Sequence, residues 1–150
     1  MDITPKTCLT LSAHPLMNGI KEASGSIAAA ARIRNLCRDE FFIWSGNDDQ
    51  IVPMMSIGAK GVISVLSNVR PKQTQIMTQL CLRGEFLQAG KLQTDLMPLI
   101  DALFCEVNPI PVKKALELEN LNPGAPRLPL TELDRTHLEQ LTQALALCKT

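Results

Sequence analysis

Strand-like and helix-like patterns alternate along the first half of this 150-residue sequence. A short strand is predicted within 17–24, a buried strand in the aromatic and β-branched run 40–46, and another strand over 61–68, and each is followed by a segment with helical propensity or periodicity. Such alternation indicates βαβ units, in which helices connect the strands of a parallel sheet. We therefore predict an α/β fold with three strand–helix units between residues 19 and 84.

After residue 84 the alternation stops and only helical patterns remain. The first predicted helix has Thr4 as its N-cap and Pro5 at its first position, which is a common helix start. Helices are predicted over 4–14, 26–39, 48–58, 71–84, 85–104, 109–121 and 132–149. The chain thus divides into an α/β part, 1–84, and a C-terminal helical region, 85–150.

Charge and hydropathy restrict the functions of the chain. Lys plus Arg and Asp plus Glu each number 15, so the formal net charge is zero, whereas nucleic acids and anionic membranes are bound by basic surfaces. No apolar run is long enough to span a bilayer, and the N-terminus lacks a secretory signal pattern. We therefore expect a cytoplasmic protein that binds neither nucleic acid nor membrane.

The five cysteines are odd in number, scattered, and never arranged as C-x-x-C. This usage predicts free, buried thiols in a reducing compartment. The sequence also lacks the closely spaced ligand pairs that hold zinc. We therefore expect no metal site.

Lys21 follows the apolar pair Gly19-Ile20 in the stretch GIKEASG, 19–25. A lysine attacks a carbonyl carbon only as the free amine, and desolvation at a strand end inside a barrel favours that form. Taken alone, the local pattern favours a solvated lysine that leaves a strand end. Lys21 is the first candidate for chemistry, because the sequence has no GxGxxG, P-loop, GxSxG or HExxH motif.

Other candidates follow the next strands. In SGNDDQ, 45–50, Gly46 lets a substrate approach the backbone closely, although the Asn-Asp-Asp run would by itself serve to cap the next helix. The strand at 61–68 has no titratable side chain, so its contribution would be a backbone carbonyl. In FCEVNPIPVKKAL, 104–116, Glu106 and Asn108 are candidate hydrogen-bonding anchors of a structural joint.

Together these stretches resemble the C-terminal half of the dihydrodipicolinate synthase family, which belongs to the pyruvate-dependent class I aldolases. The resemblance covers essentially the whole chain. The spacing agrees as well, with 25 residues from Lys21 to Gly46 (46 − 21) and 17 from Gly46 to Ile63 (63 − 46). The resemblance implies a partial TIM (β/α)8 barrel, about strands six to eight with their helices, followed by a C-terminal helical segment.

The resemblance also implies a reaction and its residues. Lys21 matches the family's lysine that forms a Schiff base with pyruvate, and Ile63 matches the residue whose backbone carbonyl contacts the bound pyruvate. Gly46, Asn47 and Asp48 would line the substrate site. The family condenses pyruvate with L-aspartate 4-semialdehyde, in lysine biosynthesis through diaminopimelate, and it needs no cofactor because the lysine is the covalent catalyst.

The resemblance further implies an incomplete barrel. A closed barrel needs about 250 residues and eight strands, and the sequence has no tyrosine, a residue that the family uses in its proton relay. Open strand edges and an uncovered sheet face pair with other chains. We therefore expect a homo-oligomer or a complementing N-terminal half, and little or no activity from this chain alone.

Two alternatives stay open at this point. The first is that the chain resembles a C-terminal piece of another pyruvate-dependent aldolase, such as N-acetylneuraminate lyase. The residues that select the aldehyde would lie in the other half of the barrel, so they do not separate the two families here. The other alternative is a non-catalytic half-barrel that associates with a full-length synthase.

Overall fold

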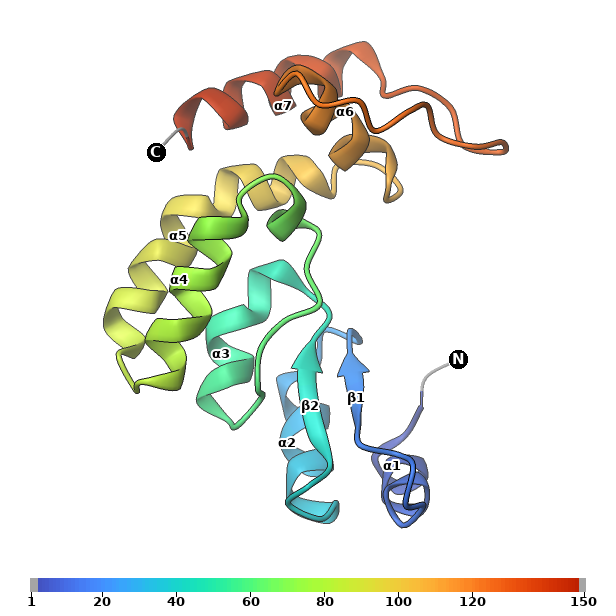
Figure 1. The fold of residues 1–150 in the computed structure, drawn as a ribbon, viewed down its shortest axis with the longest axis vertical. Coiled ribbons are helices and arrows are strands. Elements are labelled where there is room, and N and C mark those ends of the chain that lie inside the picture. The colour runs from blue at the N-terminus through green and yellow to red at the C-terminus, as the bar shows by residue number, and fades with distance from the viewer. Residues whose placement is uncertain (1–2, 149–150) are drawn as a thin grey trace. The chain divides into compact units, whose positions relative to one another are not determined.

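The computed structural model describes residues 3–148, and this part of the chain contains seven α-helices and two β-strands (Figure 1). The helices are α1 Pro5–Ser12, α2 Ile27–Leu36, α3 Ile51–Ser56, α4 Pro71–Leu82, α5 Phe86–Leu103, α6 Ile110–Leu118 and α7 Arg135–Leu147. The strands are β1 Gly19–Glu22 and β2 Phe42–Ser45, and short 3-10 helices occupy Asp48–Gln50 and Leu66–Asn68. Every predicted helix is confirmed; Lys149, in the last predicted helix, lies outside the described residues.

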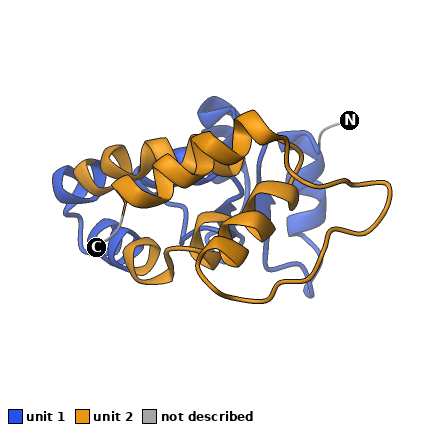
Figure 2. Ribbon diagram, turned by 90° about the horizontal axis from the view of Figure 1, so that it is seen from above, with its two compact units in different colours: residues 1–64, 76–90 blue, residues 65–75, 91–150 orange. Residues whose placement is uncertain are grey.

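The chain forms two compact units, which Figure 2 distinguishes by colour. The first comprises Met1–Ser64 and Ile76–Gly90, and the second comprises Val65–Gln75 and Lys91–Thr150. Both strands belong to the first unit with α1, α2 and α3, while α6 and α7 belong to the second. Each packing unit combines segments from separate parts of the chain. The border that we expect after residue 84, between the partial barrel and the helical region, therefore stays a prediction.

The two strands of the first unit pair in parallel, with Gly19 opposite Phe42 and Glu22 opposite Ser45. The connection between them is α2, whose N-cap Ser26 accepts a hydrogen bond from the Ala29 amide at 3.1 Å. Side chains alternate across a strand, and in β2 Ile43 and Ser45 are buried. One face of the strand pair therefore packs into the core of the unit, and the other face is more open.

The prediction of a third strand over 61–68 was wrong in extent. Only residues around Val62 pair with β2, through a single parallel bridge to Ser45, in which the Ile63 amide donates to the Ser45 carbonyl at 2.8 Å. The pairing stops there because β2 itself ends at Ser45 and the chain turns into the 3-10 helix Asp48–Gln50. The last predicted strand residues form the 3-10 helix Leu66–Asn68 instead.

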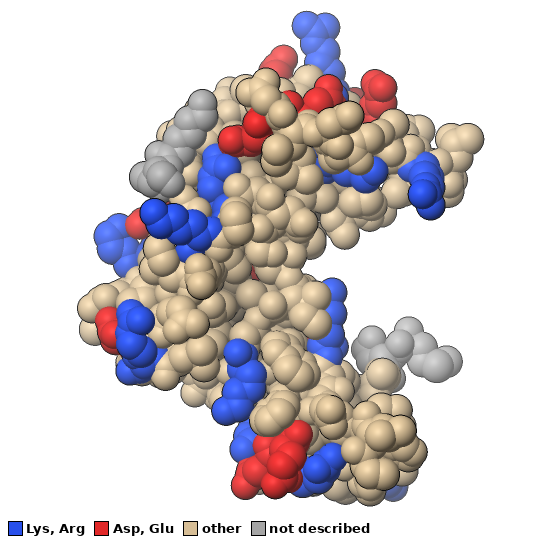
Figure 3. Space-filling view, viewed as in Figure 1, with Lys and Arg blue, Asp and Glu red and all other residues tan. Residues whose placement is uncertain are grey.

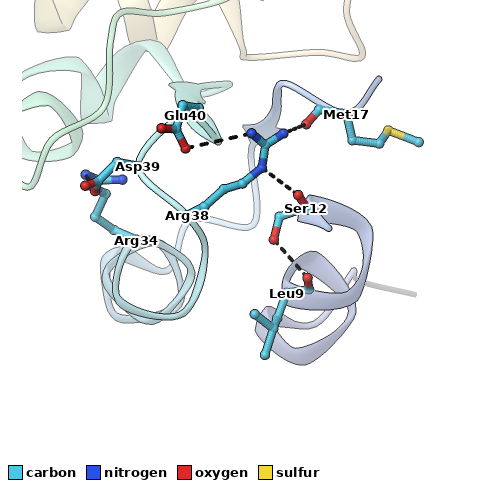
Figure 4. A network of polar contacts seen from close by, with 7 residues as sticks. All are labelled: Leu9, Ser12, Met17, Arg34, Arg38, Asp39 and Glu40. Atoms are coloured by element: carbon cyan, nitrogen blue, oxygen red, sulfur yellow. Dashed lines mark hydrogen bonds and ion pairs between the residues drawn. The ribbon is translucent and has the colours of Figure 1, made fainter. Parts of the chain in front are cut away.

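Arg38 follows the end of α2 and reaches the segment that leads into β1 (Figure 4). Its guanidinium donates to the carbonyl oxygens of Ser12, at 2.7 Å, and Met17, at 3.1 Å, and lies 3.8 Å from Glu40. Ser12 ends α1, where carbonyl groups lack helical partners and attract a cation. One side chain thus holds both the end of α1 and the segment that leads into β1.

Arg70 is the central polar group of the second unit and is only 7% exposed. Its guanidinium donates to the carbonyls of Leu145, at 3.3 Å, and Cys148, at 3.0 Å, and pairs with Glu119 at 3.0 Å. The two carbonyls belong to the C-terminal end of α7 and the residue that caps it. A buried cation therefore holds the end of α7 against the end of α6.

Glu106 holds the opposite end of α7, as its sequence position as an anchor predicted. Its Oε1 accepts a hydrogen bond from the Asp134 amide at 2.9 Å and lies 2.7 Å from His137 Nδ1. These contacts, led by the one with His137, hold the pKa of the Glu106 carboxyl below its usual range. The segment before α6 is thereby tied to the N-terminus of α7.

Charged side chains of both signs are interspersed with uncharged ones on the face shown in Figure 3. Within residues 3–148, no helix has the length and hydropathy needed to cross a membrane. All five cysteines are free, four are buried and Cys105 is half-buried. Burial raises the pKa of the Cys8, Cys81 and Cys105 thiols, which keeps them protonated.

We predict that Arg70→Ala lowers the free energy of unfolding by roughly 2–4 kcal/mol, because it leaves helix-end carbonyls and Glu119 without their charged donor. Urea unfolding of the whole chain measures this loss. Arg83→Ala is the matched control, since Arg83 pairs with Glu85 at 2.6 Å but is largely exposed, and it should cost less than about 1 kcal/mol. Equal losses in the two variants would contradict a central role for Arg70.

We predict that the N-terminus of α7 loosens in acid. A carboxyl with a lowered folded-state pKa stabilises the fold above its unfolded-state pKa, and this contribution is lost as the pH falls through the folded-state value. The protection factor of the Asp134 amide, from hydrogen exchange followed by NMR, should therefore decrease at pH values below the usual glutamate pKa of about 4.3. Glu106→Gln should remove much of this pH dependence, whereas Glu139→Gln, on the exposed side of α7, should preserve it.

Candidate active site

The carboxyl ends of β1 and β2 lie side by side, so the loops that follow them meet at one edge of the first unit. Lys21 stands opposite Trp44 in the register, one residue before the end of β1. Residues opposite one another in a sheet direct their side chains to the same face. Lys21 is exposed and therefore lies on the open face, away from buried Ile43 and Ser45.

Gly46 lies directly against Lys21. Its amide donates to the Glu22 carbonyl at 2.7 Å, which continues the pairing of the strands by one residue. A Cβ atom at this position would lie 2.8 Å from Cε of Lys21 and 2.5 Å from Cβ of Ala23. The structure thus brings two predicted site residues together and leaves room for no side chain at position 46.

Asn47 and Asp48 occupy different environments. Asn47 follows Gly46, and its amide donates to Ser45 Oγ at 3.2 Å while its carbonyl accepts from the same hydroxyl at 2.8 Å. Asp48 begins the 3-10 helix and is only 1% exposed. Asn47 is therefore held half-buried at the end of β2, whereas the carboxylate of Asp48 is inside the protein. Their roles as substrate-binding residues stay predictions.

Ile63 lies at the same edge from the other side of β2. Its amide is bonded to the Ser45 carbonyl, and its side chain is 50% exposed. This hydrogen bond places the Ile63 backbone beside the carboxyl end of β2, at the residue before Gly46. The strand β1, with Lys21, lies on the other side of β2. The contact of the Ile63 carbonyl with a bound ligand stays a prediction.

Glu22 is a site-forming residue that sequence reasoning did not single out. Its carboxylate is buried and accepts from the Ser24 amide at 2.7 Å and from Ser24 Oγ at 3.2 Å. Ser24 Oγ in turn accepts from the Ser26 amide at 3.2 Å, at the N-cap of α2. The sequence signal for Glu22 was its position directly after Lys21, because adjacent residues of a strand point to opposite faces. Glu22 fixes the loop that contains Ala23, a wall of the Gly46 position.

A hollow of about 570 Å³ runs along the side of β1 that faces away from β2. Its lining consists of residues from the start of α1, from β1 and from the first turns of α2, namely Ile3, Thr4, Pro5, Ile20, Lys21, Glu22, Ala23, Ser24, Ser26, Ala29 and Ile33. It is open and mostly apolar, with Lys21 as the one cation among these residues. Within residues 3–148 no cluster of His, Cys, Asp and Glu is arranged to hold a metal ion.

Solved structures with the same arrangement define the class of the chain. The 4-hydroxy-tetrahydrodipicolinate synthase of Methylacidiphilum fumariolicum SolV is 38% identical, with a TM-score of 0.94 over 97% of this chain and 49% of its own. The chloride-inhibited dihydrodipicolinate synthase of Acinetobacter baumannii, complexed with pyruvate, is 33% identical, with a TM-score of 0.91 over 97% of this chain and 50% of its own. The fold is therefore half of a TIM barrel with a C-terminal helical segment, as predicted.

Sequence comparisons place the chain more closely. The model of the dihydrodipicolinate synthetase family matches residues 1–147. A 4-hydroxy-tetrahydrodipicolinate synthase of Caldicellulosiruptor saccharolyticus is 49% identical over 145 residues, which are 97% of this chain and 49% of the relative. The chain belongs to the dihydrodipicolinate synthetase family, and it spans about half the length of the curated relatives it matches.

We predict that Gly46→Ala destabilises the first unit by about 1–3 kcal/mol, because the added methyl group must displace Lys21 or the Ala23 loop. Thermal unfolding at a fixed scan rate measures the effect. The control is Gly90→Ala in α5, where a Cβ atom meets nothing within 4 Å, and this change should stabilise the helix by about 0.5–1 kcal/mol. A neutral Gly46→Ala would refute the close approach.

Proposed function

We propose that this chain carries the covalent half of a 4-hydroxy-tetrahydrodipicolinate synthase, in which Lys21 forms a Schiff base with pyruvate. The supporting observation is that Lys21 and Gly46 meet at the carboxyl ends of β1 and β2, where a Cβ atom on Gly46 would lie 2.8 Å from Cε of Lys21. Membership of the family and the pyruvate complex of a structural neighbour agree with this role. No cofactor is required, since the lysine is itself the catalyst.

The reaction begins with attack of the neutral Lys21 amine on C2, the ketone carbon of pyruvate. The new C–N bond replaces the C–O bond, and the oxygen leaves as water, which gives an imine. Loss of a proton from C3 to solvent converts the imine into an enamine. C3 then attacks the aldehyde carbon of L-aspartate 4-semialdehyde, the aldehyde oxygen takes up a proton, and attack by the product's own amine or by water releases Lys21.

The surrounding residues have matching roles in this proposal. Gly46 lets the Lys21 side chain pass close over the end of β2, and the Ile63 carbonyl makes a dipolar contact with the bound keto acid. Asn47 lines the edge of the site, and Asp48 supports it from inside. The product would enter lysine biosynthesis through diaminopimelate, a cytoplasmic pathway.

The exposure of Lys21 limits the activity that we propose for the 150 residues alone. A closed site excludes water from the reaction, and the Lys21 side chain is exposed to solvent. A further parallel strand along the hollow beside β1 would cover Lys21 and pair the open backbone edge of β1. We propose that a second copy or a complementing barrel half supplies such a strand, and that the chain without it turns over slowly or not at all.

Trapping of the imine tests this proposal directly. The chain is incubated with pyruvate and sodium borohydride, and its intact mass is measured. We expect a mass increase equal to pyruvate less one water plus two hydrogens, which peptide mapping assigns to Lys21 and which Lys21→Ala abolishes. Lys60→Ala is the control, because Lys60 is an exposed lysine of the same unit and its loss should leave the adduct intact.

The opposite result has a definite meaning. A folded chain that gives no adduct at Lys21 would refute covalent catalysis by this chain and would favour a non-catalytic half-barrel that associates with a full-length synthase. An adduct distributed equally over surface lysines would have the same meaning, because it would show no special reactivity of Lys21.

A further inference from the structure

The open face of the strand pair carries two aromatic rings as well as Lys21. Trp44, the only tryptophan in the sequence, stands opposite Lys21, and Phe42 stands opposite Gly19. The two rings meet edge to face, with centroids 6.0 Å apart and planes at 75°, which is a favourable arrangement for aromatic side chains. Aromatic rings on the open face beside Lys21 indicate a role other than packing in the core.

Two glycines lie against the indole. A Cβ atom at Gly19 would overlap the Phe42 carbonyl oxygen and would lie 2.6 Å from Cζ3 of Trp44, whereas one at Gly61 would lie 3.7 Å from Cδ1, an ordinary contact. Gly19 belongs to β1, and Gly61 leads into the segment on the other side of β2. The indole therefore spreads across the backbones on both sides of β2, and at Gly19 a larger residue would not fit.

The indole and the Lys21 side chain point in opposite directions along the strands. Gly19 precedes Lys21 by two residues, so the ring of Trp44 leans toward the amino end of β1. Gly46 follows the carboxyl end of β2, and Cε of Lys21 lies against it. Because Lys21 and Trp44 are opposite one another in the register, the indole lies beside the flexible four-carbon stem of Lys21, on the side away from Gly46.

We propose that Trp44 is a positioning residue that holds the Lys21 amine at the Gly46 end of the strands, where the 2-oxo acid binds. The inference rests on the proposed function, since it assigns the amine a reaction. Restriction of a reacting group to its productive direction raises the rate of attack by reducing the entropy lost on reaching that geometry. Trp44 acts through Lys21 and takes no part in the bonds that form or break.

The test compares variants that differ in the ring. Imine formation is trapped with cyanoborohydride over a range of pyruvate concentrations, and rates are normalised to the folded fraction measured by circular dichroism. In Trp44→Leu the maximal trapping rate should fall roughly tenfold, because the stem samples unproductive directions, while the half-saturating pyruvate concentration changes little. Trp44→Phe should restore most of the rate. If Trp44→Leu does not fold, Trp44→Met takes its place.

Phe42→Leu is the matched control. It removes an aromatic ring from the same face and the same strand, at the position opposite Gly19, and leaves the Trp44 indole in place, so the trapping rate per folded molecule should fall much less than in Trp44→Leu. A loss equal to that of Trp44→Leu would overturn the proposal, because it would show that any weakening of this face has the same effect.

Tryptophan emission supplies an independent readout. Because Trp44 is the only tryptophan, pyruvate should change the emission of the chain with the same concentration dependence as trapping, and Lys21→Ala should abolish the change. An adduct that forms at the same rate in Trp44→Leu would overturn this inference alone. The absence of any adduct in the unchanged chain would overturn the proposed function, and the inference with it.

Discussion

The parallel pairing of β1 with β2 organises the first unit and its candidate site. Parallel strands bring their carboxyl ends to one edge, and the Gly46 amide extends the pairing to the Glu22 carbonyl at 2.7 Å. This close approach forces Lys21, Ala23 and Gly46 into contact distance. The pairing of Ser45 with the chain at Val62 then adds the Ile63 backbone to the same edge. Three short stretches of backbone, at the end of β1, at the end of β2 and at Val62, thus define the candidate site.

Alternation along β1 gives adjacent residues opposite roles. Lys21 is on the open face, and Glu22 is buried on the other, where its carboxylate bonds to Ser24 and so fixes the loop that leads to the N-cap of α2. A short strand can combine a reactive group with its structural support in this way, because its side chains point to opposite faces. Without the buried carboxylate, the wall formed by Ala23 would have no fixed position.

The second unit is organised around the two ends of α7. Glu106 contacts the N-terminal end of this helix through Asp134 and His137, and Arg70 contacts the carbonyls at its C-terminal end. An anion at the first end and a cation at the last complement the helix dipole. The apolar stripe of the helix is buried between these contacts, at Leu141 and Leu145. Residues far apart in the sequence thus set the position of one amphipathic helix.

Local signals in the sequence were sufficient for the helices and for β1 and β2, whereas the prediction of Lys21 and Gly46 as site residues rested on the resemblance to the family. Caps such as Thr4 and Ser26 act within one helical turn, so a single sequence specifies them. The short extent of pairing at Val62, the burial of Glu22, the partners of Glu106 and the placement of Trp44 over Gly19 were decided by tertiary structure. Each of these involves residues brought together from distant positions or from opposite strands, and the energy of such contacts is not contained in any local stretch of sequence.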